Sequence, residues 1–296
     1  MKKVFFLIAT NIAVLLGLSV VFHVAVGFFG TRADGLLGGS IAGVQIGPLL
    51  IFSAVFGFGG AFVSLLLSKV IAKMSVGAHV INPAAPGCER DAWLVAAVEK
   101  LARQAGVRTP EVAIYSGAPN AFATGASKNK ALVAVSDGLL SAMSRPQVEA
   151  VLGHELAHVA NGDMVTLTLV QGVLNTFVLF FSRLVGILVD RQLGTKRGRG
   201  IGYFAAYYAC QIVFGLLAGL VVAWVSRRRE FGADRGSAQY LGSPALMISA
   251  LRRLGGISGE PLPDNLSAFG ISGGRKTSLF ASHPPIEERI AALERG

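Results

Sequence analysis

Four long apolar blocks, at about residues 4–26, 45–71, 164–189 and 201–225, constrain this chain most strongly. Each block is long enough to cross a bilayer as a helix. Hydrophobic residues make up 52% of the chain and charged residues only 15%, against about a quarter charged in an ordinary globular domain. The sequence therefore predicts an α-helical multi-pass membrane protein.

The first block follows Met1-Lys2-Lys3, a start that a cleaved signal peptide and a retained signal anchor share. The apolar stretch is too long for a signal peptide, no clear small-residue cleavage site follows it, and a second block comes soon after. We therefore expect residues 1–74 to form a membrane hairpin whose two spans are about residues 4–26 and 45–71.

Positive charges flank this first hairpin at its two outer ends. Lys2 and Lys3 precede the first span, Lys69 and Lys73 end the second, and the short loop between the spans has no net charge. The positive-inside rule then places the N-terminus and the segment after Lys73 in the cytoplasm.

Residues 164–226 are predicted to form a second membrane hairpin. Its first block contains Arg183, which is costly in the middle of a bilayer, and the loop between its two blocks is basic, against the charge rule if both blocks cross. The sequence leaves open whether this hairpin spans fully. Arg227-Arg228-Arg229 ends the last block and is typical of a lipid-headgroup anchor rather than of substrate binding.

Residues 75–163 and 227–296 have the composition of a soluble domain, and we expect them to form its two parts. Hydrophobic periodicity predicts a helix over 91–105, and β-branched runs predict strands over 111–115 and 131–136. The segment 117–130 between the strands is rich in turn residues.

The segment after these strands begins a further helix. Ser144 is a suitable N-cap, Gln147 lies at the position that completes a capping box, and Pro146 is tolerated in the first turn. This helix carries the run Gly153-His154-Glu155-Leu156-Ala157-His158. Residues i and i+4 share one helix face, so His154 and His158 can converge on one metal ion while Glu155 reaches a water held by it.

A catalytic zinc usually has three protein ligands and one open position for water. Glu230 and Asp234 lie one turn apart in a helix that we expect to begin just after the arginine cluster. This spacing suits a carboxylate ligand backed by a second carboxylate that orients a ligand histidine. Alternatively, both are solvated acids at a helix start, which the helix dipole favours.

Four motifs occur in one order along the chain, with apolar blocks between them. They are residues 119–125 (PNAFATG), 154–164 (HELAHVANGDM), 230–234 (EFGAD) and 282–285 (SHPP). In these motifs the chain resembles the HtpX-type heat-shock membrane metalloproteases, relatives of the CaaX prenyl proteases. The resemblance covers nearly the whole chain.

The resemblance implies a zincin-like (gluzincin) α+β protease domain with one Zn²⁺ per chain. It implies that His154, His158 and Glu230 are the zinc ligands and that Glu155 is the catalytic base. It also implies a bacterial inner (plasma) membrane location, a cytoplasmic active site and misfolded membrane proteins as substrates. Asp234 is then expected to orient a ligand histidine.

Other residues are weaker candidates for substrate handling. His283 could donate to the charge that develops on the substrate carbonyl, although a turn histidine before two prolines explains it equally well. Asn120 could present backbone near the metal, or merely make a turn. The strand containing Val133 and Val135 is predicted to be an exposed edge that adds an extended substrate by backbone hydrogen bonds; an ordinary core strand is the alternative.

The rival functional class is a membrane transporter or scaffold whose metal motif is coincidental or catalytically dead. A zinc transporter would place its histidines and carboxylates inside the spans, and a dead protease would be expected to lack a ligand or the base. The net charge of +10 mostly reflects juxtamembrane clusters, and no basic face with interleaved aromatics suggests nucleic-acid binding. The sequence carries no signal for an oligomeric state.

Overall fold

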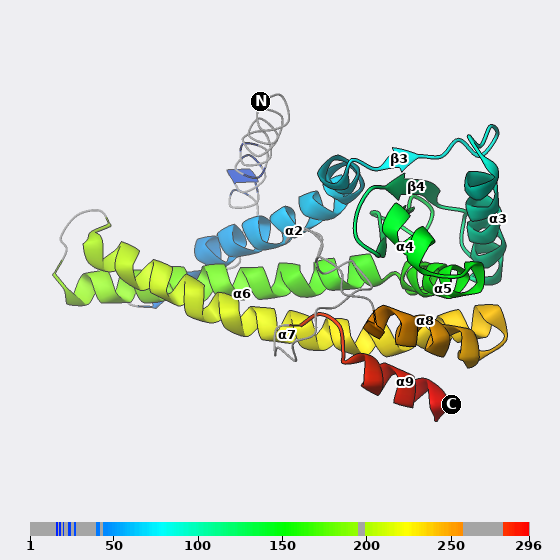
Figure 1. Cartoon of the computed structure of the whole chain (residues 1–296). Coiled ribbons are helices and arrows are strands. Elements are labelled where there is room, and N and C mark those ends of the chain that lie inside the picture. The colour runs from blue at the N-terminus through cyan, green and yellow to red at the C-terminus, as the bar shows by residue number, and fades with distance from the viewer. Residues whose placement is uncertain are drawn as a thin grey trace. The chain divides into compact units, whose positions relative to one another are not determined.

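The computed structural model describes residues 16, 18, 20, 23, 24, 27, 40, 41, 44–194, 199–256 and 281–295 (Figure 1). Most of the predicted span 4–26 therefore lies outside the described residues. The chain divides into two compact units. One comprises residues 1–64 and 168–221, and the other comprises residues 65–167 and 222–296.

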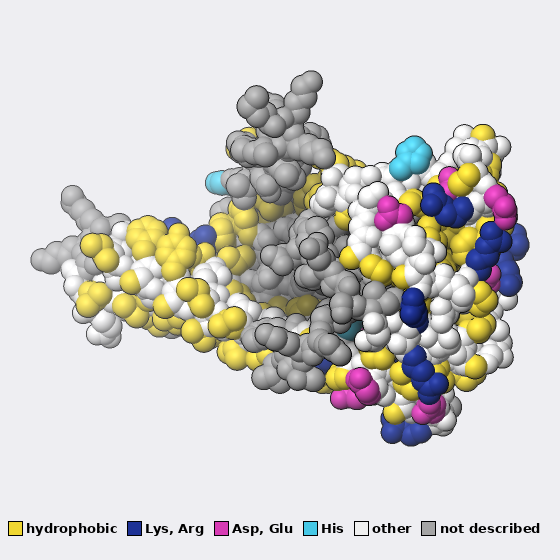
Figure 2. Space-filling model, viewed as in Figure 1, with side chains coloured by type: hydrophobic (Ala, Val, Ile, Leu, Met, Phe, Trp, Pro, Cys, Tyr) yellow, Lys and Arg dark blue, Asp and Glu magenta, His cyan; other side chains and the backbone are white. Residues whose placement is uncertain are grey.

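Long apolar helices dominate the first unit. The helices that contribute to it are α2 (Ile46–Val76), α6 (Asp163–Gln192) and α7 (Ile201–Leu241), after a short antiparallel pair of strands, β1 (Ser40–Ile41) and β2 (Val44–Gln45). By length and composition all three helices could cross a membrane. They contain the predicted blocks 164–189 and 201–225 and all of block 45–71 except Gln45, which belongs to β2. Many hydrophobic side chains of α6 and α7 are exposed, and some of them are visible in Figure 2.

Two glycines let α2 and α6 approach closely. A Cβ atom on Gly57 would lie 2.6 Å from the backbone nitrogen of Thr176, and one on Gly172 would lie 2.5 Å from the Phe58 ring. Such contacts between small residues and a facing helix are typical of membrane packing. Arg183 of α6 also has a partner, because its guanidinium lies 3.6 Å from the centre of the Phe52 ring.

A four-stranded mixed sheet lies in the second unit. Its order is β3 (His79–Val80), β4 (Glu111–Tyr115), β6 (Leu132–Ser136) and β5 (Ala121–Thr124). β4 and β6 are parallel, and the other neighbours are antiparallel. The strand predictions for 111–115 and 131–136 are confirmed, but β5 falls inside the segment that was predicted to be turns.

The prediction that the strand of Val133 and Val135 is an exposed edge is wrong. β6 pairs with β4 on one side and with β5 on the other, and both valines are fully buried. Its backbone groups are therefore used by neighbouring strands, so no substrate strand can be added there. Among the described strands, β5 is the one at the edge next to β6.

Helices cover this sheet and complete the core of the second unit. They are α3 (Glu89–Gln104), α4 (Asp137–Ala142), α5 (Arg145–Asn161), α8 (Pro244–Gly256) and α9 (Ile286–Glu294). α5 packs against β5, α3 and α8, and most of its residues from Val148 to Val159 are buried. The predicted capping box is confirmed, since Gln147 accepts a hydrogen bond from the Ser144 backbone at 3.0 Å. Gly162 ends α5 with a positive φ of 70°.

α7 is one continuous helix of 41 residues. It contains both the apolar segment 201–225 and the later polar segment with Glu230 and Asp234. The prediction of a new helix after the arginine cluster is therefore wrong in its start. Arginine has a high helix propensity, so the cluster continues a helix that has already begun.

Candidate metal centre

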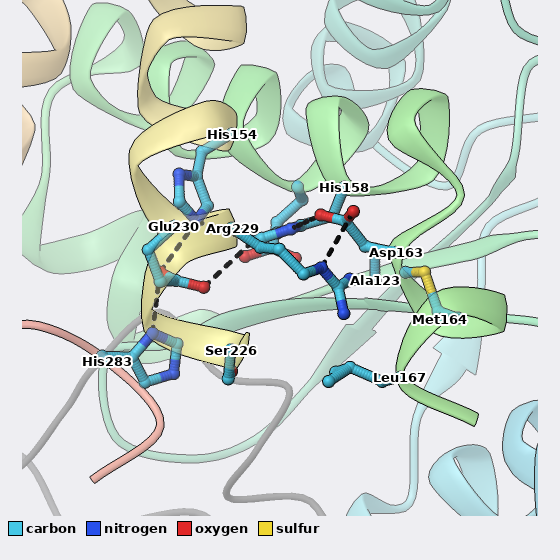
Figure 3. A pocket seen from close by; sticks show the side chains of 11 residues that line it. Ala123, His154, His158, Asp163, Met164, Leu167, Ser226, Arg229, Glu230 and His283 are labelled. Atoms are coloured by element: carbon cyan, nitrogen blue, oxygen red, sulfur yellow. Dashed lines mark hydrogen bonds and ion pairs between the residues drawn. The ribbon is translucent and has the colours of Figure 1, made fainter. Parts of the chain in front are cut away.

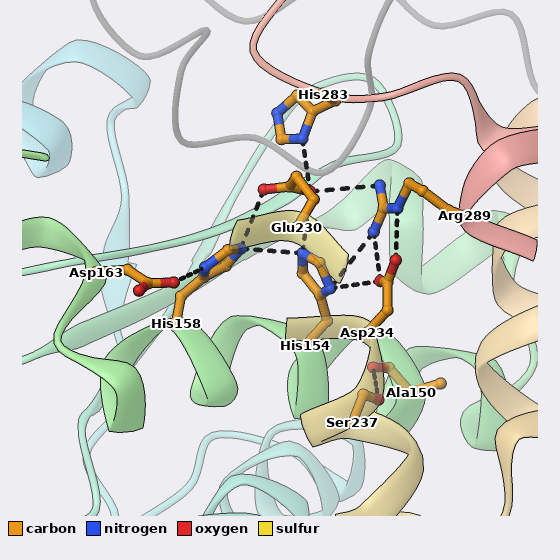
Figure 4. Close-up of polar contacts among 9 residues, drawn as sticks. All are labelled: Ala150, His154, His158, Asp163, Glu230, Asp234, Ser237, His283 and Arg289. Atoms are coloured by element: carbon orange, nitrogen blue, oxygen red, sulfur yellow. Dashed lines mark hydrogen bonds and ion pairs between the residues drawn. The ribbon is translucent and has the colours of Figure 1, made fainter. Parts of the chain in front are cut away.

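Two helices supply the potential metal ligands. His154 and His158 lie on one face of α5, and their Nε2 atoms are 3.1 Å apart. Glu230 of α7 faces them, with Oε1 3.2 Å from His158 Nε2 and Oε2 3.5 Å from His154 Nε2 (Figure 4). The three ligand atoms lie within 4.8 Å of one another.

This donor set fits a zinc ion. Two imidazole nitrogens and one carboxylate are a ligand set of catalytic zinc sites that keep a fourth position open. The surroundings also favour a positive charge at this point. Burial lowers the pKa of His154, but its contacts with Asp234 and Glu230 raise the pKa overall. A metal cation would satisfy the same carboxylates without requiring a protonated imidazole.

Each of the two histidines has a carboxylate beside its Nδ1 atom. His154 Nδ1 lies 2.8 Å from Asp234 Oδ1, and His158 Nδ1 lies 2.5 Å from Asp163 Oδ2. A carboxylate at Nδ1 fixes the proton there, so Nε2 keeps a lone pair for a metal. Asp234 was predicted for this role. Asp163, at the start of α6, was missed, although it lies within the second motif.

Each of these carboxylates is in turn held by an arginine. Arg289 of α9 donates to Asp234 at 2.8 Å from Nε and at 2.6 Å from Nη2. Arg229 lies with Nε 2.9 Å from Asp163 Oδ1. Burial raises the pKa of Asp234, but the nearby charge and hydrogen bonds of Arg289 lower the pKa to about 2. Asp234 is therefore an acceptor for His154 at any physiological pH.

Glu155 lies next to the ligands and is 2% exposed. Burial raises the pKa of its carboxyl group more than the two histidines lower it. Its carboxylate also accepts a hydrogen bond from the backbone N–H of Ala123 in β5. This hydrogen bond thus joins β5 to α5.

A pocket opens beside the potential ligand atoms (Figure 3). Its lining consists of Ala123, His154, Glu155, His158, Asp163, Met164, Leu167, Ser226, Arg229, Glu230 and His283. The structure thus brings together all the predicted metal ligands, Glu155 and His283.

The other predicted substrate residues lie outside this lining. Val133 and Val135 belong to the sheet interior, and Asn120 is buried beside β5. The Asn120 side chain accepts a hydrogen bond from the Ala121 backbone at 2.8 Å, and the backbone N–H of Asn120 donates to Ser136 Oγ. A role of Asn120 in substrate binding stays a prediction.

His283 makes a contact that the sequence did not indicate. Its Nδ1 lies 2.8 Å from Glu230 Oε2. The segment that carries it is tied to α7 nearby, because Arg227 donates to the carbonyl of Ala281 at 2.9 Å. His283 therefore contacts the Glu230 carboxylate and lines the same pocket.

Comparison with known proteins places this arrangement in a family. The sequence model of Peptidase family M48 matches residues 89–296. The chain belongs to peptidase family M48. The match includes every potential ligand and Glu155. It also includes the aspartates that contact the two histidines and the arginines that contact those aspartates.

Close relatives share the full length of the chain. A "Protease HtpX homolog" from Bordetella petrii is 54% identical over 296 residues, covering 99% of this chain and 98% of the relative. A homologue from Bordetella pertussis is 55% identical with the same coverage. One from Chlorobium phaeobacteroides is 53% identical over 99% of this chain and 95% of its own length. The resemblance to HtpX-type proteases is confirmed.

A solved structure shares the fold. The crystal structure of S. mikatae Ste24p aligns with 96% of this chain and 65% of its own, at a TM-score of 0.55 and 17% sequence identity. The predicted fold class, a helical membrane protein with an α+β metalloprotease domain, is confirmed by the helices, the sheet and these matches. The chain is a membrane metalloprotease of the M48 family.

Proposed function

We propose that this protein is a zinc-dependent endopeptidase in which His154, His158 and Glu230 hold one zinc ion per chain. The observation that carries the proposal is the convergence of these three ligand atoms within 4.8 Å, with Glu155 in the same pocket. This arrangement supports a protease over the rival role of a transporter or scaffold, because His154, His158, Glu230 and Glu155 line one pocket.

Zinc would supply a Lewis acid that polarises the peptide carbonyl and lowers the pKa of a bound water to about 7. Glu155 is the proton acceptor in this scheme. Because burial raises the pKa of Glu155, its carboxylate is a better base than an exposed glutamate and can return the proton to the leaving amine. Asp234 and Asp163 keep the ligand imidazoles in the tautomer that the metal requires.

His283 is our candidate for stabilising the charge that develops on the substrate carbonyl. It lines the pocket, and its side chain is 8% exposed. Its Nε2 has no hydrogen-bond partner within the part of the chain that the structure describes. A donor that is buried and without a partner is positioned to meet an oxyanion.

The substrate backbone is expected to lie along β5 rather than along β6. β5 contributes Ala123 to the pocket, and it pairs with β6 alone among the described strands. An extended chain added at a sheet edge is held through main-chain hydrogen bonds. This supports a protease that cleaves unfolded or misfolded proteins, including membrane proteins, with little regard for side chains.

We further propose that the protein resides in a bacterial inner membrane with its site in the cytoplasm. The lysines that flank the first hairpin support this orientation. In this arrangement residues 1–74 and 164–226 are the membrane hairpins, and 75–163 with 227–296 form the protease domain. Whether the second hairpin crosses fully is decided by labelling a cysteine introduced at Gly198, which lies outside the described residues.

The test is zinc analysis of the purified protein together with a peptidase assay. Glu155→Gln should keep near-stoichiometric zinc and lose activity by several orders of magnitude, on the order of 10³-fold or more, because the ligands remain while the proton acceptor is gone. Glu149→Gln, on the same helix and partly exposed, is the matched control and should stay active. Loss of zinc from Glu155→Gln, with activity restored by excess zinc, would show that Glu155 is a ligand instead.

A further inference from the structure

The three consecutive arginines of α7 have three different surroundings. Arg227 donates to the carbonyl of Ala281. The guanidinium of Arg228 lies 4.4 Å from the centre of the Trp224 ring, and that ring is half exposed. Arg229 instead lines the pocket beside the ligand atoms, with 15% of its side chain exposed. Among the three arginines, Arg228 alone thus keeps surroundings typical of a lipid anchor.

Arg229 has a donor that its neighbours leave unused. Its Nε forms an ion pair with Asp163 Oδ1 at 2.9 Å (Figure 3). Both Nε and Nη1 are buried without a hydrogen-bond partner in residues 44–194, 199–256 or 281–295, and Nη1 has no ion-pair partner there either. Met164 and Leu167 provide apolar wall beside it. Buried charged donors are nearly always satisfied, so one that lacks a partner at a pocket wall indicates that a ligand supplies the acceptor.

We propose that Arg229 binds the substrate main chain, donating from Nη1 to a peptide carbonyl oxygen next to the scissile bond. This inference rests on the proposed peptidase function and adds a substrate-binding residue to it. No bond is made or broken at Arg229. Its contribution is to hold the extended peptide in register with the metal and Glu155.

The charges around the pocket favour a neutral acceptor over a carboxylate. Glu155, Asp163 and Glu230 line the same pocket, and Asp163 already balances the charge of Arg229. An acidic substrate side chain would meet these three carboxylates, whereas a peptide carbonyl brings a strong acceptor and no net charge. Every peptide substrate offers such a carbonyl, which suits an enzyme that reads the backbone.

Arg289 provides an internal contrast. It holds Asp234 much as Arg229 holds Asp163, but it is 1% exposed, bonds to Asp234 with two nitrogens and is not part of the pocket lining. Both arginines support a ligand histidine through an aspartate. Of these two arginines, only Arg229 lines the pocket.

The test is a backbone scan of one peptide substrate, in which each carbonyl in turn is replaced by a thiocarbonyl, a weaker acceptor. In the zinc-loaded wild-type enzyme, one position other than the scissile carbonyl should lower kcat/KM on the order of 10-fold. In Arg229→Gln, kcat/KM should be lower for the parent peptide, and the same replacement should have no further effect. Zinc content and the thermal midpoint are measured for each variant.

Arg228→Gln is the matched control, since it removes the neighbouring charge outside the pocket and should retain the wild-type response to every replacement. If Arg229→Gln loses zinc or unfolds, Arg229→Lys serves instead. Lysine can still pair with Asp163 but lacks the second nitrogen of the fork, so the penalty at the sensitive position should shrink.

Two results would overturn the inference. One is a wild-type scan without any sensitive position beyond the scissile carbonyl. The other is an equal penalty at that position in the wild type and in the folded Arg229 variant. If the zinc-loaded wild type cleaves no peptide at all, the proposed peptidase function fails first, which is a distinct outcome.

Discussion

Replacing Arg289 with methionine should strongly destabilise the protease domain. Arg289 is 1% exposed, and it donates two hydrogen bonds to Asp234 and lies 3.5 Å from Glu230. Methionine is an apolar side chain of adequate length, so the variant leaves two buried carboxylates with less compensating charge. Breaking a buried ion pair in this way costs about 3–5 kcal/mol.

This cost corresponds to a large change in thermal stability. For a domain of this size each kcal/mol shifts the midpoint by about 2–4 °C, so the metal-free Arg289→Met variant should unfold roughly 6–20 °C below its parent. The exposed pair Arg252–Glu294, with side chains 66% and 52% exposed, links α8 to α9 nearby. Arg252→Met should cost about 1 kcal/mol or less and is the matched control.

The assay is thermal unfolding in detergent, with Glu155→Gln as the parent so that the enzyme cannot digest itself. The metal is first removed with a chelator, because bound zinc would partly neutralise Glu230. The double variant Arg289→Met, Asp234→Leu should be more stable than Arg289→Met alone, since it removes the stranded charge. A loss below about 1 kcal/mol in the single variant would refute the assignment of a buried, charge-compensating role.

The remaining predictions concern the metal, the orientation and the sheet. Glu230→Ala should lose most of its zinc, whereas Asp234→Ala should lower zinc affinity about 10- to 100-fold, as expected of a residue that orients a ligand; competition with a zinc chelator measures both, and unchanged zinc content in Glu230→Ala would place the third ligand elsewhere. In a Cys210→Ala background, the exposed Cys88 should resist an impermeant maleimide in sealed cells and react after lysis; labelling of intact cells would reverse the proposed orientation. Val133→Pro should unfold the domain, because it removes a ladder hydrogen bond from a central strand; a folded variant that had lost only cleavage, as judged by circular dichroism and peptidase rate, would contradict the strand order.

Local signals in the sequence predicted much of the structure around the candidate metal site. The capping box of Ser144 and Gln147 depends on residues three apart, and so does the helix face shared by His154 and His158. Such features follow from helix geometry alone. The long apolar helices are also predictable from one continuous stretch of sequence, because bilayer thickness fixes how many consecutive apolar residues a spanning helix needs.

Strand order was not predictable in the same way. β5 has four residues, all buried, between Asn120 and Gly125. It is therefore short, it has no alternation of apolar and polar residues, and the residues on both sides of it are typical of turns. Without β5, the next strand appeared to be an edge. The error over Val133 and Val135 therefore came from one missed neighbour rather than from the strand itself.

Polar contacts between residues far apart in the chain could not be predicted from the sequence either. Arg229 reads as one of three membrane-anchor arginines until Asp163 is seen beside it. Arg289 lies in an ordinary amphipathic helix, 55 residues from Asp234. Nothing in its spacing indicates that its side chain is buried, and only the packing of α9 shows this.

The position of Arg289 along the chain sets an order in time during biosynthesis. His154 depends on Asp234, 80 residues further on, and the arginine that holds this aspartate lies 135 residues beyond His154. At 5–20 residues per second, a ribosome needs roughly 7–27 seconds to add that stretch. Throughout this interval α5 lacks the complete chain of contacts from His154 through Asp234 to Arg289. A nascent chain can therefore insert its apolar helices into the membrane before it has an assembled site that could cleave other newly made membrane proteins.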